Sequence, residues 1–292
     1  MPPSQLTPNR ASRVGLPGRH GPIAALRAPA RGADLGATAL LVPGYTGSKE
    51  DFAPILDPVA DAGIEVIAID LPGQYESPGP DVESAYRPAP LGSVLAEVVA
   101  KIAADGRRVL LLGHSYGGLV ARAAVLDGAP VAGLTLLASG PAELSVGSRR
   151  EALDFCTATL RSRGAEATYD LLEHVSSASP NWVALPAEVS AFRRTRFLRS
   201  AVVGLLGMGD GLRHEPDLVT RLAAALRSAG AACLVVCGAD DDTWSVAAQR
   251  DMADRLEADF AVITAAAHSP NIDNPAGLLA TLLPTWRAWL AA

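Results

Sequence analysis

The chain has 292 residues, of which 49% are hydrophobic and 19% are charged, a composition typical of a folded globular protein with a sizeable core. Its net charge is −6 and its sequence pI is near 5.4, which excludes the basic surface that nucleic-acid binding requires. Residues 1–8 lack the basic start and apolar core of a signal peptide, and no stretch approaches the roughly 20 apolar residues of a membrane helix. We therefore expect a cytoplasmic protein without a membrane span, and no sequence feature assigns an oligomeric state.

The three cysteines, Cys156, Cys233 and Cys237, are expected to be free thiols in a reducing compartment. Cys233 and Cys237 fall on one predicted strand, where about 3.3 Å per residue separates them by roughly 13 Å, too far for a disulfide. This spacing suits a strand face better than a zinc site. We expect neither a metal nor a cofactor.

Predicted strands alternate with predicted helices along most of the chain. The first 20 residues carry frequent prolines and glycines and are expected to be loose. Apolar runs predict strands at residues 22–28 (an edge strand), 37–42, 64–69, 109–112, 131–138, 233–237 and 261–264. Helical patterns occupy residues 48–62, 91–104, 119–126, 245–256 and 275–290. Because the strands are continuously apolar, we expect an α/β fold with a mostly parallel, doubly wound sheet covered on both faces.

Residues 142–213 interrupt this alternation, because they have helical patterns and several aromatic residues but no good strand. We expect them to form a helical cap over the carboxyl edge of the sheet, where α/β proteins bind ligands. The α/β core would then comprise residues 1–141 and 214–292. An ordinary set of crossover helices is the alternative interpretation of the same segment.

Residues 113–117 read Gly-His-Ser-Tyr-Gly directly after a predicted buried strand and before a predicted helix. A tight strand-to-helix turn exposes the hydroxyl of Ser115 and aims the first helical amides at developing negative charge, as a nucleophile requires. Chance alone produces such a string in about a tenth of chains this rich in glycine, so the context carries the prediction. The alternative is a structural Gly-Ser turn.

A nucleophilic serine needs a base and a group that orients the base. Of the five histidines, His268 follows the last predicted strand and so falls on the same sheet edge as Ser115. The preceding strand leads into three consecutive aspartates, of which Asp241 has the most favourable spacing for orienting His268. Asp240 and Glu143 remain alternatives, and an acidic turn or helix cap is the non-catalytic interpretation.

The order Ser115, Asp241, His268 resembles the α/β-hydrolase superfamily, and in particular small serine hydrolases with a helical cap. The tripeptide at 43–45 resembles the oxyanion loop of that family, and Asp-Leu-Pro-Gly at 70–73 resembles its D-x-P-G loop. The similarity covers about residues 37–140 and 228–290.

This resemblance implies acyl transfer to water. Ser115 would attack a carbonyl, His268 would act as the general base, and Asp241 would fix its tautomer. The backbone amides of Tyr45 and Tyr116 would hold the oxyanion.

Two segments depart from the family pattern. Pro43 replaces the usual histidine of the oxyanion loop, which leaves the backbone donor in place. Residues 74–77 read Gln-Tyr-Glu-Ser where relatives usually have His-Gly-x-Ser, so the substrate pocket is expected to be unusual.

The pocket is expected to hold a small, mostly apolar molecule. We expect Tyr45, His114, Trp182 and Trp244 to line it, although His114 should point away from Ser115. A run of arginines could bind an anionic substrate tail, or it could be a solvated helix face. The run comprises Arg193, Arg194, Arg196 and Arg199.

Ester hydrolysis is the predicted reaction, and several alternatives use the same scaffold. A carbon–carbon bond hydrolase, a lactonase and a perhydrolase would share the triad. A non-hydrolytic lyase or cyclase and a ligand-binding receptor are the remaining alternatives, because a fold does not determine a function.

Overall fold

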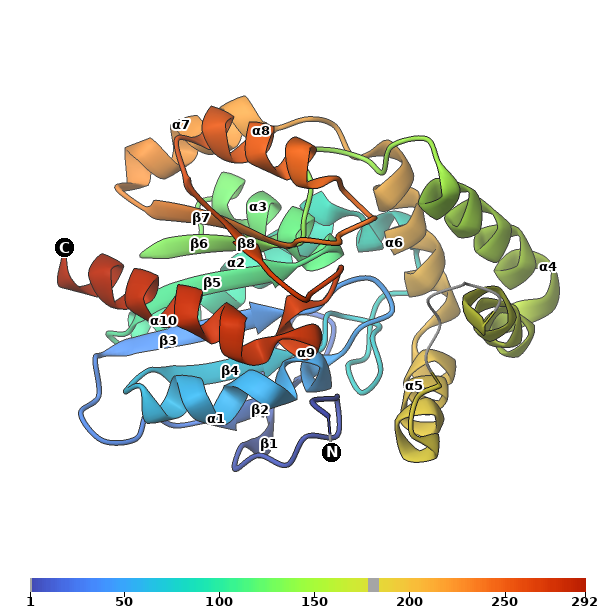
Figure 1. Ribbon diagram of the computed structural model, residues 1–292, viewed down its shortest axis with the longest axis horizontal. Coiled ribbons are helices and arrows are strands. Elements are labelled where there is room, and N and C mark those ends of the chain that lie inside the picture. The colour runs from blue at the N-terminus through green and yellow to red at the C-terminus, as the bar shows by residue number, and fades with distance from the viewer. Residues whose placement is uncertain (1, 178–183) are drawn as a thin grey trace.

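A mixed eight-stranded sheet forms the centre of the molecule in the computed structural model, which describes residues 2–177 and 184–292 (Figure 1). The strands follow the spatial order β1-β2-β4-β3-β5-β6-β7-β8. Their bounds are β1 Ser12–Leu16, β2 Ile23–Ala28, β3 Ala37–Val42, β4 Glu65–Ile69, β5 Arg108–His114, β6 Gly133–Leu137, β7 Ala232–Gly238 and β8 Asp259–Ile263. Strands β4, β3, β5, β6, β7 and β8 pair in parallel, whereas β1 and β2 are antiparallel additions. The predicted α/β class with a mostly parallel sheet is confirmed.

The N-terminal segment differs from its prediction. Ser12–Leu16 pairs with β2 and forms the edge strand, so the first 20 residues are not uniformly loose and β2 is not the edge. Every residue of β1 is exposed or only half-buried, so this strand has no apolar run for a sequence pattern to detect. Backbone hydrogen bonds to β2, with Leu16 opposite Ile23, hold it in place instead.

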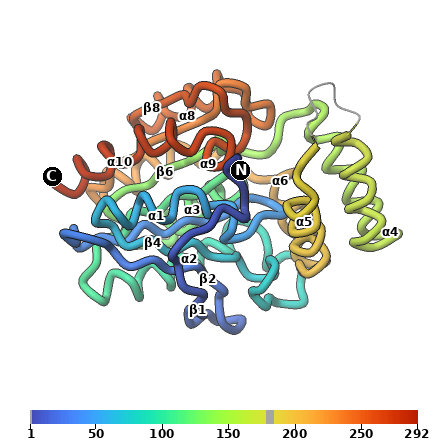
Figure 2. The backbone as a smooth tube through the Cα atoms, turned by 60° about the horizontal axis from the view of Figure 1, so that its bottom comes forward, coloured from blue at the N-terminus to red at the C-terminus, as the bar shows by residue number. Residues whose placement is uncertain are grey.

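Helices cover both faces of the sheet (Figures 1 and 2). On one face, side chains of α1 and α10 pack together in one apolar core with strand residues such as Leu41 and Leu112. On the other face, a second core joins α2, α3, α7 and α8 to the alternate strand residues, such as Leu40 and Leu111. The helix bounds are α1 Ala53–Asp61, α2 Pro88–Ala104, α3 Tyr116–Leu126, α7 Val219–Ala229, α8 Val246–Leu256, α9 Pro270–Asp273 and α10 Pro275–Ala291.

Three further helices lie at one end of the molecule, beyond the carboxyl ends of the parallel strands (Figures 1 and 2). They are α4 Ser148–Ser177, α5 Ala187–Arg199 and α6 Val202–His214. Gly164 breaks α4 into two helical parts, because its φ of 79° and ψ of −176° are not helical. These helices belong to the segment for which a cap was predicted, and the division into core and cap stays a prediction. Within the described ranges, no helix has the length and apolar character needed to cross a membrane.

Helices α2 and α3 approach each other closely at Gly92. A Cβ atom there would lie 2.5 Å from the Cβ of Ala123 and 2.8 Å from backbone atoms of α3. In contrast, a Cβ on Gly209 of α6 would have its nearest neighbours at ordinary contact distance, 3.5 Å away. These two helical glycines therefore form a matched pair for measuring the contribution of close helix packing.

We expect Gly92→Ala to lower the free energy of unfolding by about 1–2 kcal/mol, because overpacking outweighs the gain of about 1 kcal/mol in helix propensity. Gly209→Ala should leave stability unchanged or raise it by up to about 1 kcal/mol. Urea unfolding of both variants measures this difference. Equal effects of the two substitutions would contradict the proposed role of the α2–α3 contact.

Candidate active site

Ser115 occupies a strained turn between β5, which ends at His114, and α3, which begins at Tyr116. Its φ of 53° and ψ of −121° are rarely adopted by a residue with a side chain. A Cβ on Gly113 would lie 2.3 Å from the carbonyl oxygen of Gly117. A Cβ on Gly117 would lie 2.5 Å from carbonyl oxygens at the end of β3 and just after it. The two glycines therefore permit the close contacts that this turn needs.

His268 and Asp241 complete a hydrogen-bonded chain with this serine. The Oγ atom of Ser115 lies 2.9 Å from Nε2 of His268, and Nδ1 of His268 lies 3.0 Å from Oδ1 of Asp241. The three residues follow β5, β8 and β7, whose carboxyl ends meet at the same edge of the sheet. The structure thus brings the three predicted side chains together in the predicted order.

Asp241 is held in its charged form. Burial alone would raise the pKa of this carboxyl group, but the hydrogen bond and charge of His268 outweigh that effect and lower it. The backbone N–H of Thr243 donates to Oδ1 over 3.0 Å, and Nε2 of Gln249 donates to Oδ2 over 2.9 Å. Both carboxylate oxygens are therefore hydrogen-bonded, which fixes the plane of the group beside His268.

The two alternative acids lie elsewhere. The side chain of Asp240 is exposed, and a carboxylate oxygen of Glu143 lies 3.5 Å from Nη1 of Arg150. Of the three carboxylates considered, Asp241 is the one that contacts His268. The geometry therefore favours Asp241 as the acid.

The amides of Tyr45 and Tyr116 are available beside Ser115, because neither has a hydrogen-bond acceptor within the described part of the chain. Nε2 of Gln74 donates to the carbonyl oxygen of Gly44 over 2.8 Å, while its Oε1 accepts from the backbone N–H of Leu71 over 3.0 Å. The carbonyl of Gly44 and the N–H of Tyr45 belong to one planar peptide and point in opposite directions. The backbone N–H of Gly47 donates to the same carbonyl over 3.0 Å, so the fully buried Gln74 and Gly47 together fix the direction of the Tyr45 amide.

His114 supports the histidine loop. Its Nε2 atom lies 2.8 Å from the carbonyl oxygen of His268, and because a carbonyl can only accept, His114 is the donor. Burial, followed by the nearby charge of His268, lowers the pKa of His114 to about 4, so its ring is neutral at pH 7. Its ring also borders the cavity, and its Nε2 hydrogen bond is made to the protein; contact with a substrate stays a prediction.

The predicted pocket aromatics have different positions. Tyr45 lines the cavity, and burial raises the pKa of its phenol. Trp244 does not fulfil its prediction, because its indole is 3% exposed and packs against Gly140, with Nε1 lying 3.4 Å from the carbonyl oxygen of Glu143. The apolar character of tryptophan predicts burial as readily as ligand contact, which accounts for this difference. Trp182 lies outside the described residues.

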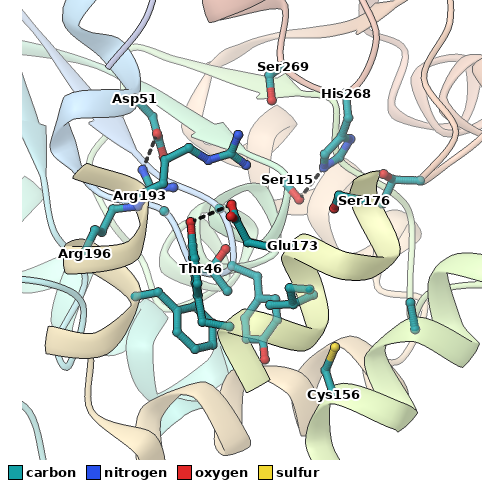
Figure 3. Close-up of a pocket in the computed structure, with 18 of the residues that line it drawn as sticks. Thr46, Asp51, Ser115, Cys156, Glu173, Ser176, Arg193, Arg196, His268 and Ser269 are labelled. Atoms are coloured by element: carbon teal, nitrogen blue, oxygen red, sulfur yellow. Dashed lines mark hydrogen bonds and ion pairs between the residues drawn. The ribbon is translucent and has the colours of Figure 1, made fainter. Parts of the chain in front are cut away.

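A cavity of about 750 Å³ opens above the serine (Figure 3). Ser115 and His268 contribute to one side, and the loop after β3 contributes Gly44–Gly47. Helices α4 and α6 contribute an apolar part that includes Leu153, Cys156 and Leu212. Such a space accommodates a small-molecule ligand with an apolar portion next to the hydroxyl of the serine.

Sequence reasoning missed the roles of three supporting side chains. Gln74 lies in the segment already singled out as a departure, so a signal existed, but its contact with Gly44 joins positions 30 residues apart. His114 was recognised only by its position beside Ser115. Gln249 lies on α8 and carries no signal, because its contact with Asp241 appears only after the helix has folded.

Comparison with known families assigns the chain to a family. The model of the alpha/beta hydrolase family matches residues 39–281, which is most of the chain. The chain belongs to the α/β-hydrolase family. A sequence comparison with curated proteins finds no match.

Solved structures share the fold of this α/β-hydrolase. A carboxylesterase structure from the thaumarchaeon Nitrososphaera gargenis has a TM-score of 0.74 at 16% identity, covering 96% of this chain and 99% of that chain. MenH from S. aureus has a TM-score of 0.73 at 20% identity, covering 91% and 98%. The N-acyl homoserine lactonase AidH, complexed with N-hexanoyl homoserine, has a TM-score of 0.71 at 20% identity, covering 96% and 97%. At these identities the similarity shows the fold alone.

We expect His114 to make folding pH-dependent. Its pKa is about 4 in the folded state and 6.5 when unperturbed, so the unfolded state binds the additional proton between these values. The contribution of His114 to the free energy of unfolding is complete above pH 6.5. It falls by about 3 kcal/mol in total as the pH decreases toward 4. Urea unfolding from pH 4 to 8 should show this slope.

His114→Gln should flatten that slope, while the same substitution at the exposed His20 should leave it unchanged. If His114→Gln shows the same dependence of the free energy of unfolding on pH as the wild type, other groups are responsible for the proton uptake.

Proposed function

We propose that this α/β-hydrolase cleaves an ester or related acyl bond through Ser115, His268 and Asp241, with an acyl-enzyme intermediate. The observation that carries this proposal is the continuous hydrogen-bonded chain from the serine Oγ through both imidazole nitrogens to a buried carboxylate. The family membership supports hydrolase activity, and the adjoining cavity supports a small-molecule substrate.

The reaction begins when Oγ of Ser115 attacks the carbonyl carbon and transfers its proton to Nε2 of His268. Asp241 accepts from Nδ1–H and stabilises the imidazolium that forms. The tetrahedral intermediate collapses as Nε2–H gives its proton to the departing alcohol, leaving the acyl group on Ser115. In the second half, His268 takes a proton from water as the water oxygen attacks the acyl carbon. The second tetrahedral intermediate then collapses: the bond between the acyl carbon and Oγ breaks, Nε2–H returns its proton to Oγ of Ser115, and the carboxylic acid leaves.

The oxyanion is stabilised by the amides of Tyr45 and Tyr116. Removing one donor of this kind typically costs a factor of about 10²–10³ in kcat, because preorganised dipoles act where charge develops. The Tyr116 amide lies at the first turn of α3, whose unpaired N–H groups favour negative charge. The Tyr45 amide depends on Gln74, which makes this glutamine a positioning residue.

Several alternative functions use the same scaffold. Lactone hydrolysis requires the same steps within a cyclic ester, and the structural similarity to AidH motivates including an acyl homoserine lactone among the test substrates. A lyase, a cyclase or a binding receptor would not need an acyl-enzyme. Reaction of the serine with an acyl-type probe therefore separates the hydrolases from the binding receptor.

We expect a fluorophosphonate probe to label the wild-type protein, because the probe requires an activated serine and an accessible oxyanion site. Ser115→Ala should abolish labelling, and His268→Ala should reduce it by at least about 10²-fold, since the base is lost. In-gel fluorescence measures the labelling, and circular dichroism confirms the fold of each variant. A folded wild type that is not labelled would contradict the proposal and leave a binding role.

We expect Gln74→Leu to lower kcat by about 10–100-fold with little change in KM, because the Gly44–Tyr45 peptide keeps only its hydrogen bond from Gly47 and aims the Tyr45 amide less firmly at the oxyanion. Gln74→His, which restores the residue usual in the family, should recover most of the loss. Kinetics on a p-nitrophenyl ester measure both parameters.

The affinity for a boronic acid, which forms a tetrahedral adduct on the serine, should fall by the same factor as kcat/KM. A structural defect would instead lower the fraction of labelled serine without changing turnover per labelled site. That pattern would contradict the positioning role of Gln74.

A further inference from the structure

One wall of the cavity is formed by helix α5, which carries four arginines with different surroundings (Figure 3). Arg194 is not among the residues that line the cavity, and it pairs with Glu166 over 2.8 Å and with Asp170 over 2.5 Å on α4. The guanidinium of Arg199 lies 5.0 Å from the centre of the Tyr75 ring. The predicted anion site therefore cannot consist of all four side chains.

Arg196 borders the cavity, but its charge is already compensated. Its Nη1 atom lies 2.6 Å from Oδ1 of Asp51, and both side chains are largely buried. Burial would raise the pKa of Asp51, but the charge of Arg196 outweighs it and keeps this pKa low. The two residues form a neutral pair in the cavity wall, which holds α5 against the core.

Arg193 is different, because it lines the cavity without a carboxylate partner. Figure 3 shows its side chain extending over the cavity toward Ser115. Throughout residues 2–177 and 184–292, no carboxylate oxygen lies within 4.0 Å of its guanidinium. The remaining segment, Ala-Ser-Pro-Asn-Trp-Val at 178–183, contains no acidic residue. Arg193 therefore has no ion pair among the described residues.

Two acidic side chains line the described part of this cavity: Asp51, which is paired with Arg196, and Glu173. The hydroxyl of Tyr169 donates to Oε1 of Glu173 over 3.0 Å, so one of its oxygens is already used. Glu173 and Arg193 both line the cavity without forming an ion pair with each other. An incoming anion would thus meet the fork of five N–H donors on Arg193, while Glu173 would exclude anions from its own side.

We propose that Arg193 binds an anionic oxygen group, such as a carboxylate, carried by the substrate that Ser115 attacks. This inference rests on the proposed function and specifies its substrate class. The apolar part of the cavity near Leu153 and Leu212 takes the uncharged portion, and α5 takes the charged end. The favoured substrate is an amphiphilic ester with one anionic terminus. A planar guanidinium suits this task, because it binds a carboxylate through two parallel hydrogen bonds.

Two esters of equal length test this inference: p-nitrophenyl hexanoate, which ends in a methyl group, and mono-p-nitrophenyl adipate, which ends in a carboxylate. The ratio of kcat/KM for adipate over hexanoate should fall about tenfold in Arg193→Gln, mainly through KM. Arg194→Gln is the matched control, because it removes the same charge from the neighbouring position of the same helix, which does not line the cavity and is already paired. Its ratio should stay within about twofold of the wild type.

Ionic strength supplies a second signature. Raising the salt concentration from about 0.01 M to 1 M shortens the Debye length from about 30 Å to 3 Å. The adipate preference of the wild type should shrink accordingly, and that of Arg193→Gln should respond much less. An unchanged ratio in Arg193→Gln, or an equal fall in Arg194→Gln, would overturn the inference.

A binding measurement separates this inference from the proposed reaction. The p-nitroanilides of adipate and hexanoate bind without hydrolysis to Ser115→Ala, which lacks the nucleophile, and calorimetry gives both affinities. The adipate compound should bind more tightly. Adding Arg193→Gln should lower the ratio of the two affinities about tenfold. Equal binding of both compounds would refute the anion site even if ester hydrolysis is observed. Competition by adipate and by hexyl phosphate then distinguishes a carboxylate site from a phosphate site.

Discussion

The backbone of Ser115 is the constraint on which the remainder of the site depends. A serine at φ 53° is strained, and it persists because β5 and α3 are each anchored in the core on both sides of it. The turn sets the direction of the Oγ atom and also makes the next amide the first of a helix. Nucleophile and oxyanion donor are therefore products of one local conformation. The glycines on either side contribute only space, which is why their spacing is visible in the sequence.

The parallel sheet converts this local feature into a site. Parallel strands end at one edge, so the loop that follows β5 meets the loops that follow β7 and β8, although Ser115 and His268 are 153 residues apart in the chain. This geometric rule explains why Ser115, Asp241 and His268 could be selected from sequence alone. Each lies just after an apolar run, and residue type then indicates its chemistry. The mostly parallel core was predictable for the same reason, because buried strands read as uninterrupted apolar segments.

Other features follow from contacts that no local pattern encodes. Edge strand β1 has no buried face along its length and is held by backbone pairing, so its sequence resembles a loop. Trp244 was expected in the cavity and instead packs against Gly140, a contact that depends on tertiary packing and not on any local sequence pattern. The arginines of α5 are nearly equivalent as a sequence run, yet each has a different environment once α4 and the core surround the helix. The helical repeat predicts that the four arginine side chains point in different directions. It does not predict which of them form ion pairs.

The supporting contacts also connect substrate binding to the oxyanion donor. The N–H of Ala201, between α5 and α6, donates to the carbonyl oxygen of Gly73 over 2.8 Å, and the N–H of Tyr75 donates to Oγ of Ser200 over 3.1 Å. Gln74 lies between these two hydrogen bonds and holds the Gly44–Tyr45 peptide from the other side. One short segment thus joins the helix that carries Arg193 to the amide beside Ser115. The departure from the family pattern at this segment therefore concerns how the core and its overlying helices are joined, as much as the shape of the pocket.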